Sequence, residues 1–98
     1  MAKGYWIAHV EVTDPEPYSR YAAGTPDVVG EFGGTFLVRA GTHEEVEGPL
    51  SRPRNVVIEF PSYQAALDCY RSEAYQTLRE HRVGAGIASI TIVEGVQS

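Results

Sequence analysis

The fold is decided by the stretch Asn55-Val56-Val57-Ile58-Glu59-Phe60-Pro61-Ser62-Tyr63. Its first part is apolar and β-branched, which is typical of a buried strand. Pro61 ends that strand because it has no N–H to donate, and Ser62 belongs to the residue types that cap helix N-termini. A similar junction lies earlier, where the stretch from Tyr5 ends at Asp14-Pro15. Two strand-to-helix junctions in a chain of 98 residues are compatible with only a few folds.

Composition and charge indicate one ordinary globular domain over residues 1–98. The net charge of −5 argues against a nucleic-acid partner, because such a partner needs a basic patch. No apolar run approaches the roughly 20 residues of a membrane span, and the N-terminus lacks the shape of a signal peptide. Cys69 is the only cysteine, so no internal disulfide forms, and we expect a cytoplasmic protein.

Alternation, capping residues and glycines predict four strands and two helical regions. The strands are expected at residues 4–12, 35–39, 54–60 and 87–94, and the helices at 15–32, 62–71 and from Ser72 to His81 or Val83. Pro26 is expected to kink or split the first helix, and residues 43–48 are expected to form a short hairpin arm. The order β-α-β-β-α-β is the ferredoxin-like, split βαβ pattern of the α+β class.

Successive side chains of a strand point to opposite faces, so the strands predict two unlike sheet faces. The first face is apolar and should lie under the helices: Trp6, Ala8, Val10, Phe36, Val38, Val56, Ile58, Phe60, Ile90 and Ile92. The second face mixes apolar and charged residues: Tyr5, Ile7, His9, Glu11, Thr35, Leu37, Arg39, Val57, Glu59, Ser89, Thr91 and Val93. Charges enclosed by a second sheet must pair or meet a ligand, because an isolated buried charge is costly. We therefore expect a homodimer with a small-molecule pocket beside or between the sheets.

Three residues of the second face, His9, Glu59 and Arg39, are the candidate catalytic residues. With strand order 4-1-3-2, His9 and Glu59 should be close to neighbours, with Arg39 one strand farther out. A carboxylate beside a histidine can orient the ring and raise its pKa, so that the ring acts as a general base. Arg39 could hold an enolate or a carboxylate. A structural ion-pair cluster at a dimer interface, or plain ligand binding, explains the same residues.

Candidate pocket-lining residues are Tyr5, Tyr18, Tyr21 and Thr91. Tyr18 and Tyr21 lie three residues apart on the first helix, where amphipathic packing also explains them. Arg52 and Arg54 flank Pro53, where a salt bridge at the rim is expected. We expect no metal and no cofactor, because no metal-ligand spacing or phosphate-binding loop occurs. Cys69 lies in an apolar helical stretch and is expected to pack there.

Four stretches carry a family resemblance: KGYWIAHVEVTDPEPYSRY (3–21), GGTFLVRAG (33–41), RPRNVVIEFPSYQAALDCYRSEAYQ (52–76) and ITIVEGV (90–96). Together they resemble the DUF1330 family over nearly the whole chain. The resemblance implies a dimeric α/β barrel with ferredoxin-like subunits. That superfamily includes cofactor-free monooxygenases, dismutases, isomerases and dehalogenases of small aromatic or oxo compounds, and proteins with only stress or regulatory roles. Thr35 departs from the family pattern, where a basic residue is common, as does Cys69, where a bulky residue is common.

The resemblance transfers fold and assembly but no reaction, so two functions stay open. The first is a cofactor-independent enzyme on a small aromatic or oxo compound, in which His9 and Glu59 move a proton and Arg39 stabilises negative charge. The second is a non-catalytic dimeric ligand-binding or stress-related protein, in which the same residues stabilise the interface.

Overall fold

The computed structural model describes residues 2–49 and 52–97. In chain order its elements are β1 (Gly4–Val12), α1 (Pro15–Glu31), β2 (Thr35–Arg39), β3 (Arg54–Phe60), α2 (Tyr63–Arg71), α3 (Glu73–Arg79) and β4 (Gly86–Glu94). The ferredoxin-like α+β fold expected from the sequence is confirmed. Two of the expected cap residues form cap bonds: the Ser62 hydroxyl accepts from the Ala65 N–H at 3.0 Å, and the Ser72 hydroxyl accepts from the Tyr75 N–H at 3.1 Å. Asp14, at the N-terminus of α1, forms no cap bond with its side chain.

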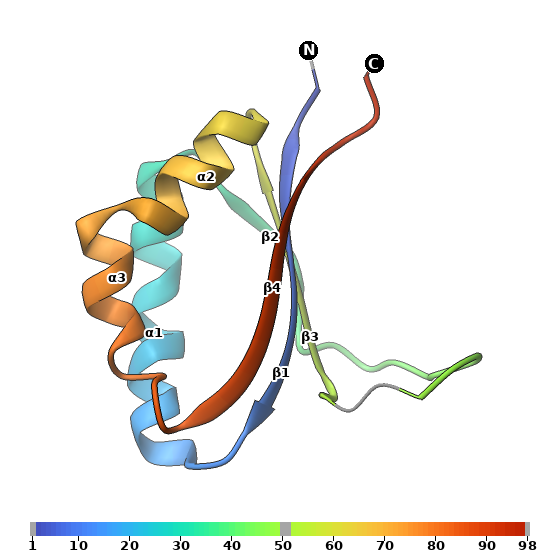
Figure 1. Cartoon of the computed structure of the whole chain (residues 1–98), viewed down its shortest axis with the longest axis vertical. Coiled ribbons are helices and arrows are strands. Elements are labelled where there is room, and N and C mark those ends of the chain that lie inside the picture. The colour runs from blue at the N-terminus through green and yellow to red at the C-terminus, as the bar shows by residue number, and fades with distance from the viewer. Residues whose placement is uncertain (1, 50–51, 98) are drawn as a thin grey trace.

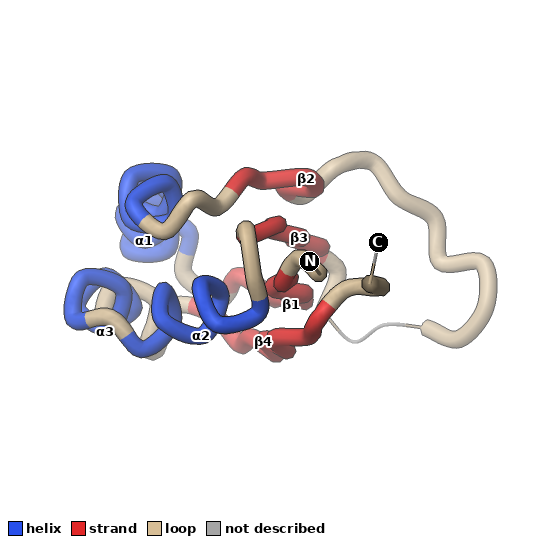
Figure 2. Tube along the Cα trace, turned by 90° about the horizontal axis from the view of Figure 1, so that it is seen from above, coloured by secondary structure: helices blue, strands red, loops and turns tan. Residues whose placement is uncertain are grey.

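The four strands form one antiparallel sheet in the order β2-β3-β1-β4, which confirms the expected strand order. All three helices cover the same face of this sheet (Figures 1 and 2). The other face carries no helix, and we call it the bare face. Its members are Tyr5, Ile7, His9, Glu11, Thr35, Val38, Asn55, Val57, Glu59, Ile87, Ser89, Thr91 and Val93. The described part of the loop after β2, residues 40–49, projects away from the helices on the bare-face side (Figure 1).

Aromatic rings fill the core between the helices and the sheet. The Trp6 ring lies against Phe60 and Tyr75 at centroid distances of 5.5 and 5.0 Å. Its indole N–H donates to the Ala66 carbonyl oxygen at 2.8 Å, so burial of this polar atom costs little. Cys69 is completely buried in α2. These residues join α2 and α3 to β1 and β3.

Pro26 neither splits nor ends α1, which runs unbroken from Pro15 to Glu31, so the expected split is not found. Proline lacks the N–H that would bond the carbonyl of the residue four positions earlier, here Ala22. Two side chains bond that carbonyl oxygen instead. The Thr25 hydroxyl donates to it at 2.9 Å, and the Arg39 guanidinium donates to it at 2.5 Å. The helix therefore continues through the proline because the freed acceptor has new donors.

A β-bulge in β2 changes the face on which its last residues lie. Phe36 pairs with Ile58, but Val38 pairs with Val57 and Arg39 with Val56, so one extra residue lies on β2. Val38 consequently leaves the helix-covered face and is 38% exposed. Arg39 moves onto the helix-covered face, where it reaches α1. The expected faces of Val38 and Arg39 were therefore wrong, whereas the remaining apolar face residues do pack in or against the core.

The expected hairpin arm at residues 43–48 is wrong, because the described loop contains no strand between residues 40 and 49. Its three glutamates and His43 are exposed. Among the helices that the structure describes, none combines the length and the apolarity needed to cross a membrane.

Candidate functional site

A pocket opens between the helix layer and the sheet, at the end where β1 and β2 finish and β3 and β4 begin. This is the lower end of the sheet in Figure 1. Its lining residues are Trp6, Ala8, Val10, Tyr18, Tyr21, Ala22, Thr25, Phe36, Arg39, Arg54, Val56, Ile58, Arg82, Ala88 and Ile90. We call it the helix–sheet pocket. Its cavity volume is about 40 Å³, and one water needs at least about 10–15 Å³, so the enclosed part of the pocket has room for about three waters.

Small side chains on the sheet leave this space open. Ala8 lies at the centre of the floor, paired with Val56 on β3 and Ile90 on β4. Ala88 lies one step farther along, opposite Val10. Larger residues at either alanine would extend toward the helices, as the neighbouring valines and isoleucines do. The pocket therefore exists because the two alanine side chains are too small to fill the space between the sheet and the helices.

Three arginines from different elements line the same pocket. Arg39 ends β2, Arg54 begins β3, and Arg82 lies in the turn between α3 and β4. Each guanidinium lies over an aromatic ring: Arg39 over Phe36 at 4.8 Å, Arg54 over Tyr18 at 5.5 Å, and Arg82 over Tyr21 at 5.2 Å. Within the described part of the chain, none of the three forms an ion pair. No acidic residue belongs to the lining.

Arg82 is the most buried of the three, with only 7% of its surface exposed. Burial by itself lowers the pKa of its guanidinium, but contact with the Tyr75 and Tyr21 hydroxyl groups more than offsets this, so the pKa is raised. The group is therefore charged at every physiological pH. Its Nε atom is buried and has no hydrogen-bond partner among the described residues, and the same holds for Nε of Arg54 and, outside the pocket lining, of Arg52 and Arg79.

Tyr21 brings a hydroxyl group to this charged end of the pocket. Its oxygen lies 2.7 Å from the Tyr75 hydroxyl oxygen, and both rings are buried. Burial raises the pKa of Tyr21 far above its usual value, although the nearby Arg82 charge acts in the opposite direction. Tyr21 is therefore a neutral hydroxyl at physiological pH, able to donate to an oxygen atom of a ligand.

The structure places the sequence candidates in two separate regions. Tyr18, Tyr21 and Arg39 line the helix–sheet pocket, whereas Tyr5, His9, Glu59 and Thr91 lie on the bare face. There, His9 Nδ1 donates to Asn55 Oδ1 at 2.9 Å. Tyr5 donates its hydroxyl to Glu59 at 3.0 Å, which raises the pKa of Tyr5.

The antiparallel register keeps His9 and Glu59 apart. His9 is opposite Asn55 and Glu59 is opposite Tyr5, so the two positions differ by four residues, about 13 Å along the strand. The expectation that they are near neighbours was therefore wrong. Since Arg39 lies on the opposite face, the three candidates do not form one catalytic group within a subunit.

Two further arginines of the pocket were not among the sequence candidates. Arg54 continues the period-two series of Val56, Ile58 and Phe60, so the alternation of β3 was a usable signal for it. Arg82 lies in a turn without periodicity, and no sequence signal pointed to it. The rim salt bridge expected for Arg52 and Arg54 is absent from the described residues: Arg52 donates to the Ser89 hydroxyl at 2.8 Å instead.

Among the described residues, no group of three or more histidine, cysteine, aspartate and glutamate side chains is placed to hold a metal ion. A comparison with curated proteins finds no match. The sequence model of the family described as "Domain of unknown function (DUF1330)" matches residues 3–96.

Solved structures share the fold at low sequence identity. A protein of unknown function from Rhodopseudomonas palustris superposes with a TM-score of 0.75 at 17% identity, covering 99% of this chain and 85% of that one. A hypothetical protein from Arabidopsis thaliana gives a TM-score of 0.62 at 14% identity, with coverages of 99% and 88%. SnoaB, a cofactor-independent oxygenase from Streptomyces nogalater, gives 0.59 at 9% identity, with coverages of 100% and 97%.

Proposed function

This chain belongs to the DUF1330 family, whose function is unknown, and we propose that it is a homodimeric protein that binds a small organic compound in the helix–sheet pocket. The observation that carries the proposal is the pocket itself. It combines an apolar floor, a tyrosine hydroxyl and three arginines that have no acidic partner among the described residues. Ligand sites are typically concave, mostly apolar and provided with a few convergent polar groups.

The bare face supports the homodimer. Three of its apolar members, Ile7, Ile87 and Val93, are 37% to 48% exposed, and a sheet face of this kind marks an interaction surface. Four of its polar members already have partners, in the pairs His9–Asn55 and Tyr5–Glu59, so a second sheet can cover these four without leaving them unpaired. In this proposal His9 and Glu59 belong to the interface rather than to a reaction.

A cofactor-independent reaction on a small aromatic or oxo compound is the enzymatic form of this proposal. Two features favour it. The neutral Tyr21 hydroxyl and the Arg82 charge lie at one end of the pocket, where they can stabilise an oxyanion in the substrate. The oxygenase SnoaB also shares the subunit fold. The alternative is a non-catalytic ligand-binding or stress-related protein, which binds the same compound without turning it over.

The experiment that tests the proposal is a native mass spectrum of freshly purified protein, compared across three variants. Ile7→Lys should convert the dimer to a monomer, because it puts a charge in the centre of the bare face. Tyr63→Lys is its matched control: Tyr63 is 38% exposed, like Ile7 at 37%, but lies on α2. Ala8→Leu should fill the pocket floor and remove bound small-molecule mass while leaving the dimer intact.

Ligand binding can be followed directly, because Trp6 is the only tryptophan and lines the pocket. Its fluorescence should change on titration with small aromatic compounds, and this change should be absent in Ala8→Leu. A wild-type monomer at micromolar concentration would contradict the homodimer. A fluorescence response that is identical in wild type and Ala8→Leu would contradict the pocket as the binding site.

A further inference from the structure

We propose that the ligand of the helix–sheet pocket is a compact organic carboxylate, whose charged end is held by Arg39, Arg54 and Arg82 and whose apolar body lies on the sheet. This inference rests on the proposed function, because it requires that the pocket binds a ligand. It adds the chemical class of that ligand, which neither the family nor the fold supplies.

The distribution of charge is the first argument. The chain has 13 acidic and only 8 basic residues, yet three arginines line one pocket and none of them has an acidic partner among the described residues. The pocket therefore gathers positive charge in a chain whose net charge is −5. Like charges gathered in a pocket also repel one another, so an anionic ligand between them lowers the energy of the group.

Arg82 provides the second argument. Its side chain is more than nine-tenths buried, and its Nε–H lacks an acceptor. A buried donor without an acceptor, and a buried charge without a counter-charge, are both costly, and each such group calls for an explanation. The tyrosine contacts of Arg82 supply neutral partners only. A ligand carboxylate would supply both the missing acceptor and the missing charge.

Arg39 and Arg54 are arranged to act on one anion. Arg39 is opposite Val56, and Arg54 lies two residues before Val56 on the same face of β3, so the two arginines are diagonal neighbours across the strand pair. Such neighbours are about 7–8 Å apart, within reach of long side chains. Arg39 is anchored at one nitrogen by the Ala22 carbonyl oxygen, which leaves its other N–H groups available. The planar guanidinium matches the two oxygens of a carboxylate.

The apolar part of the lining indicates what kind of molecule carries the carboxylate. Beyond the arginines, the floor consists of Ala8, Val56, Ile58 and Ile90, with Trp6 and Phe36 beside them. A sugar phosphate or a free inorganic anion would leave this apolar surface unused. A small aromatic or branched carboxylate would cover it, with part of the molecule outside the enclosed volume of about 40 Å³, and this modest volume excludes long-chain acids.

The test compares benzoate with benzamide, which has the same ring and nearly the same shape but no charge. Both are titrated into the full-length protein, with Trp6 fluorescence and calorimetry as readouts. Benzoate should bind at least about tenfold more tightly, because hydrogen bonds to a charged group are stronger than those between neutral groups. Arg54→Gln should remove most of this advantage while leaving the affinity for benzamide nearly unchanged.

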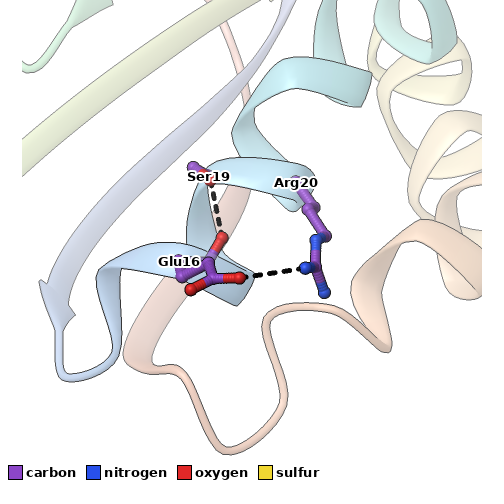
Figure 3. Close-up of polar contacts among 3 residues, drawn as sticks. All are labelled: Glu16, Ser19 and Arg20. Atoms are coloured by element: carbon purple, nitrogen blue, oxygen red, sulfur yellow. Dashed lines mark hydrogen bonds and ion pairs between the residues drawn. The ribbon is translucent and has the colours of Figure 1, made fainter.

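Arg20→Gln is the matched control. Arg20 is exposed on α1 and forms an ion pair with Glu16 at 3.2 Å, outside the pocket (Figure 3). Its removal should change neither the affinity for benzoate nor the affinity for benzamide. Arg39→Gln is the second test variant, because Arg39 is exposed at the pocket rim and its replacement is the less disruptive to folding.

The outcomes separate this inference from the proposed function. Equal affinities for benzoate and benzamide, or an equal loss of both affinities in Arg54→Gln, would overturn the inference that the ligand is a carboxylate. The proposal that the pocket binds a ligand would remain. If inorganic phosphate bound as tightly as benzoate, and if this binding depended on Arg54, the inference that the ligand has an apolar body would be overturned. If neither aromatic compound binds and Ala8→Leu loses no small-molecule mass, the proposed function fails and the inference fails with it.

Discussion

Arg39 donates a hydrogen bond to the backbone carbonyl oxygen of Ala22, joining the end of β2 to the middle of α1. The carbonyl accepts this bond because Pro26 has no N–H to offer it. Pro26 itself is not among the residues that line the helix–sheet pocket. A proline outside the pocket therefore determines where one of its three guanidinium groups is anchored.

Pro26→Ala should strengthen α1 and weaken ligand binding. Alanine restores the helical N–H, which competes with Arg39 for the Ala22 carbonyl. We expect the free energy of unfolding to rise by about 1–3 kcal/mol, because an interior proline costs roughly 3 kcal/mol relative to alanine. The affinity for benzoate should fall several-fold as Arg39 loses its anchor. Urea denaturation and the Trp6 titration measure the two effects.

Pro17→Ala serves as the control for this prediction. Pro17 lies in the first turn of α1, where an N–H has no helical acceptor, so its replacement frees or fills no carbonyl. The replacement should change the free energy of unfolding and the affinity for benzoate only slightly. A Pro26→Ala protein with unchanged affinity for benzoate would show that Arg39 does not depend on this carbonyl.

Tyr21→Phe should destabilise the protein by about 1–3 kcal/mol, the cost of leaving a buried polar group without its partner. Tyr75 is fully buried, and its hydroxyl lies 2.7 Å from that of Tyr21. Tyr18→Phe is a suitable control, since no hydrogen bond of the Tyr18 hydroxyl occurs among the described residues, and it should cost much less. Urea denaturation of both variants makes the comparison; equal losses would mean that the tyrosine pair contributes no specific stability.

The buried thiol of Cys69 should make the folded protein less stable at alkaline pH. Burial, with a smaller contribution from Glu31, raises the pKa of its thiol to about 12, whereas an unfolded cysteine ionises near about 8.5. The unfolded state therefore releases a proton that the folded state retains. The stability is fully present below about pH 8.5 and falls as the pH rises toward 12, by about 2 kcal/mol at pH 10 from this group alone.

Cys69→Ala isolates that contribution. The variant should be less stable than wild type at pH 7, because it leaves a small cavity in the core. The difference between the two proteins should shrink by about 2 kcal/mol between pH 7 and pH 10, since alanine has no thiol to ionise. Denaturation curves at pH 7, 8.5 and 10 provide the measurement, and parallel pH dependences would contradict it.

The strands and helices could be predicted because local rules determine them. The junctions at Asp14-Pro15 and Pro61-Ser62 mark helix starts by residue type, and the alternation of β1, β3 and β4 assigns their faces correctly. The bulge in β2 could not be predicted in this way. Phe36, Leu37 and Val38 are all apolar, so the pattern does not reveal where an extra residue is inserted, and Arg39 was assigned to the wrong face.

The candidate site depended on features that alternation does not encode. Alternation places His9 and Glu59 on the same face but does not give the register between β1 and β3, and this register separates them. Arg82 reaches the pocket through the turn that connects α3 to β4, and its position depends on the packing of α3 against α1. The residues that line the pocket are therefore joined by tertiary structure and lie far apart in the chain.

Neighbouring residues of β1 serve different purposes because the sheet is a single layer. Ala8 forms the floor of the pocket, while Ile7 and His9, immediately before and after it, point to the bare face. A protein engineer could therefore redesign ligand specificity at the even-numbered positions of this strand and the proposed assembly at the odd-numbered ones. The same closeness means that a shift of one residue in the pairing of β1 would exchange the two roles along its whole length.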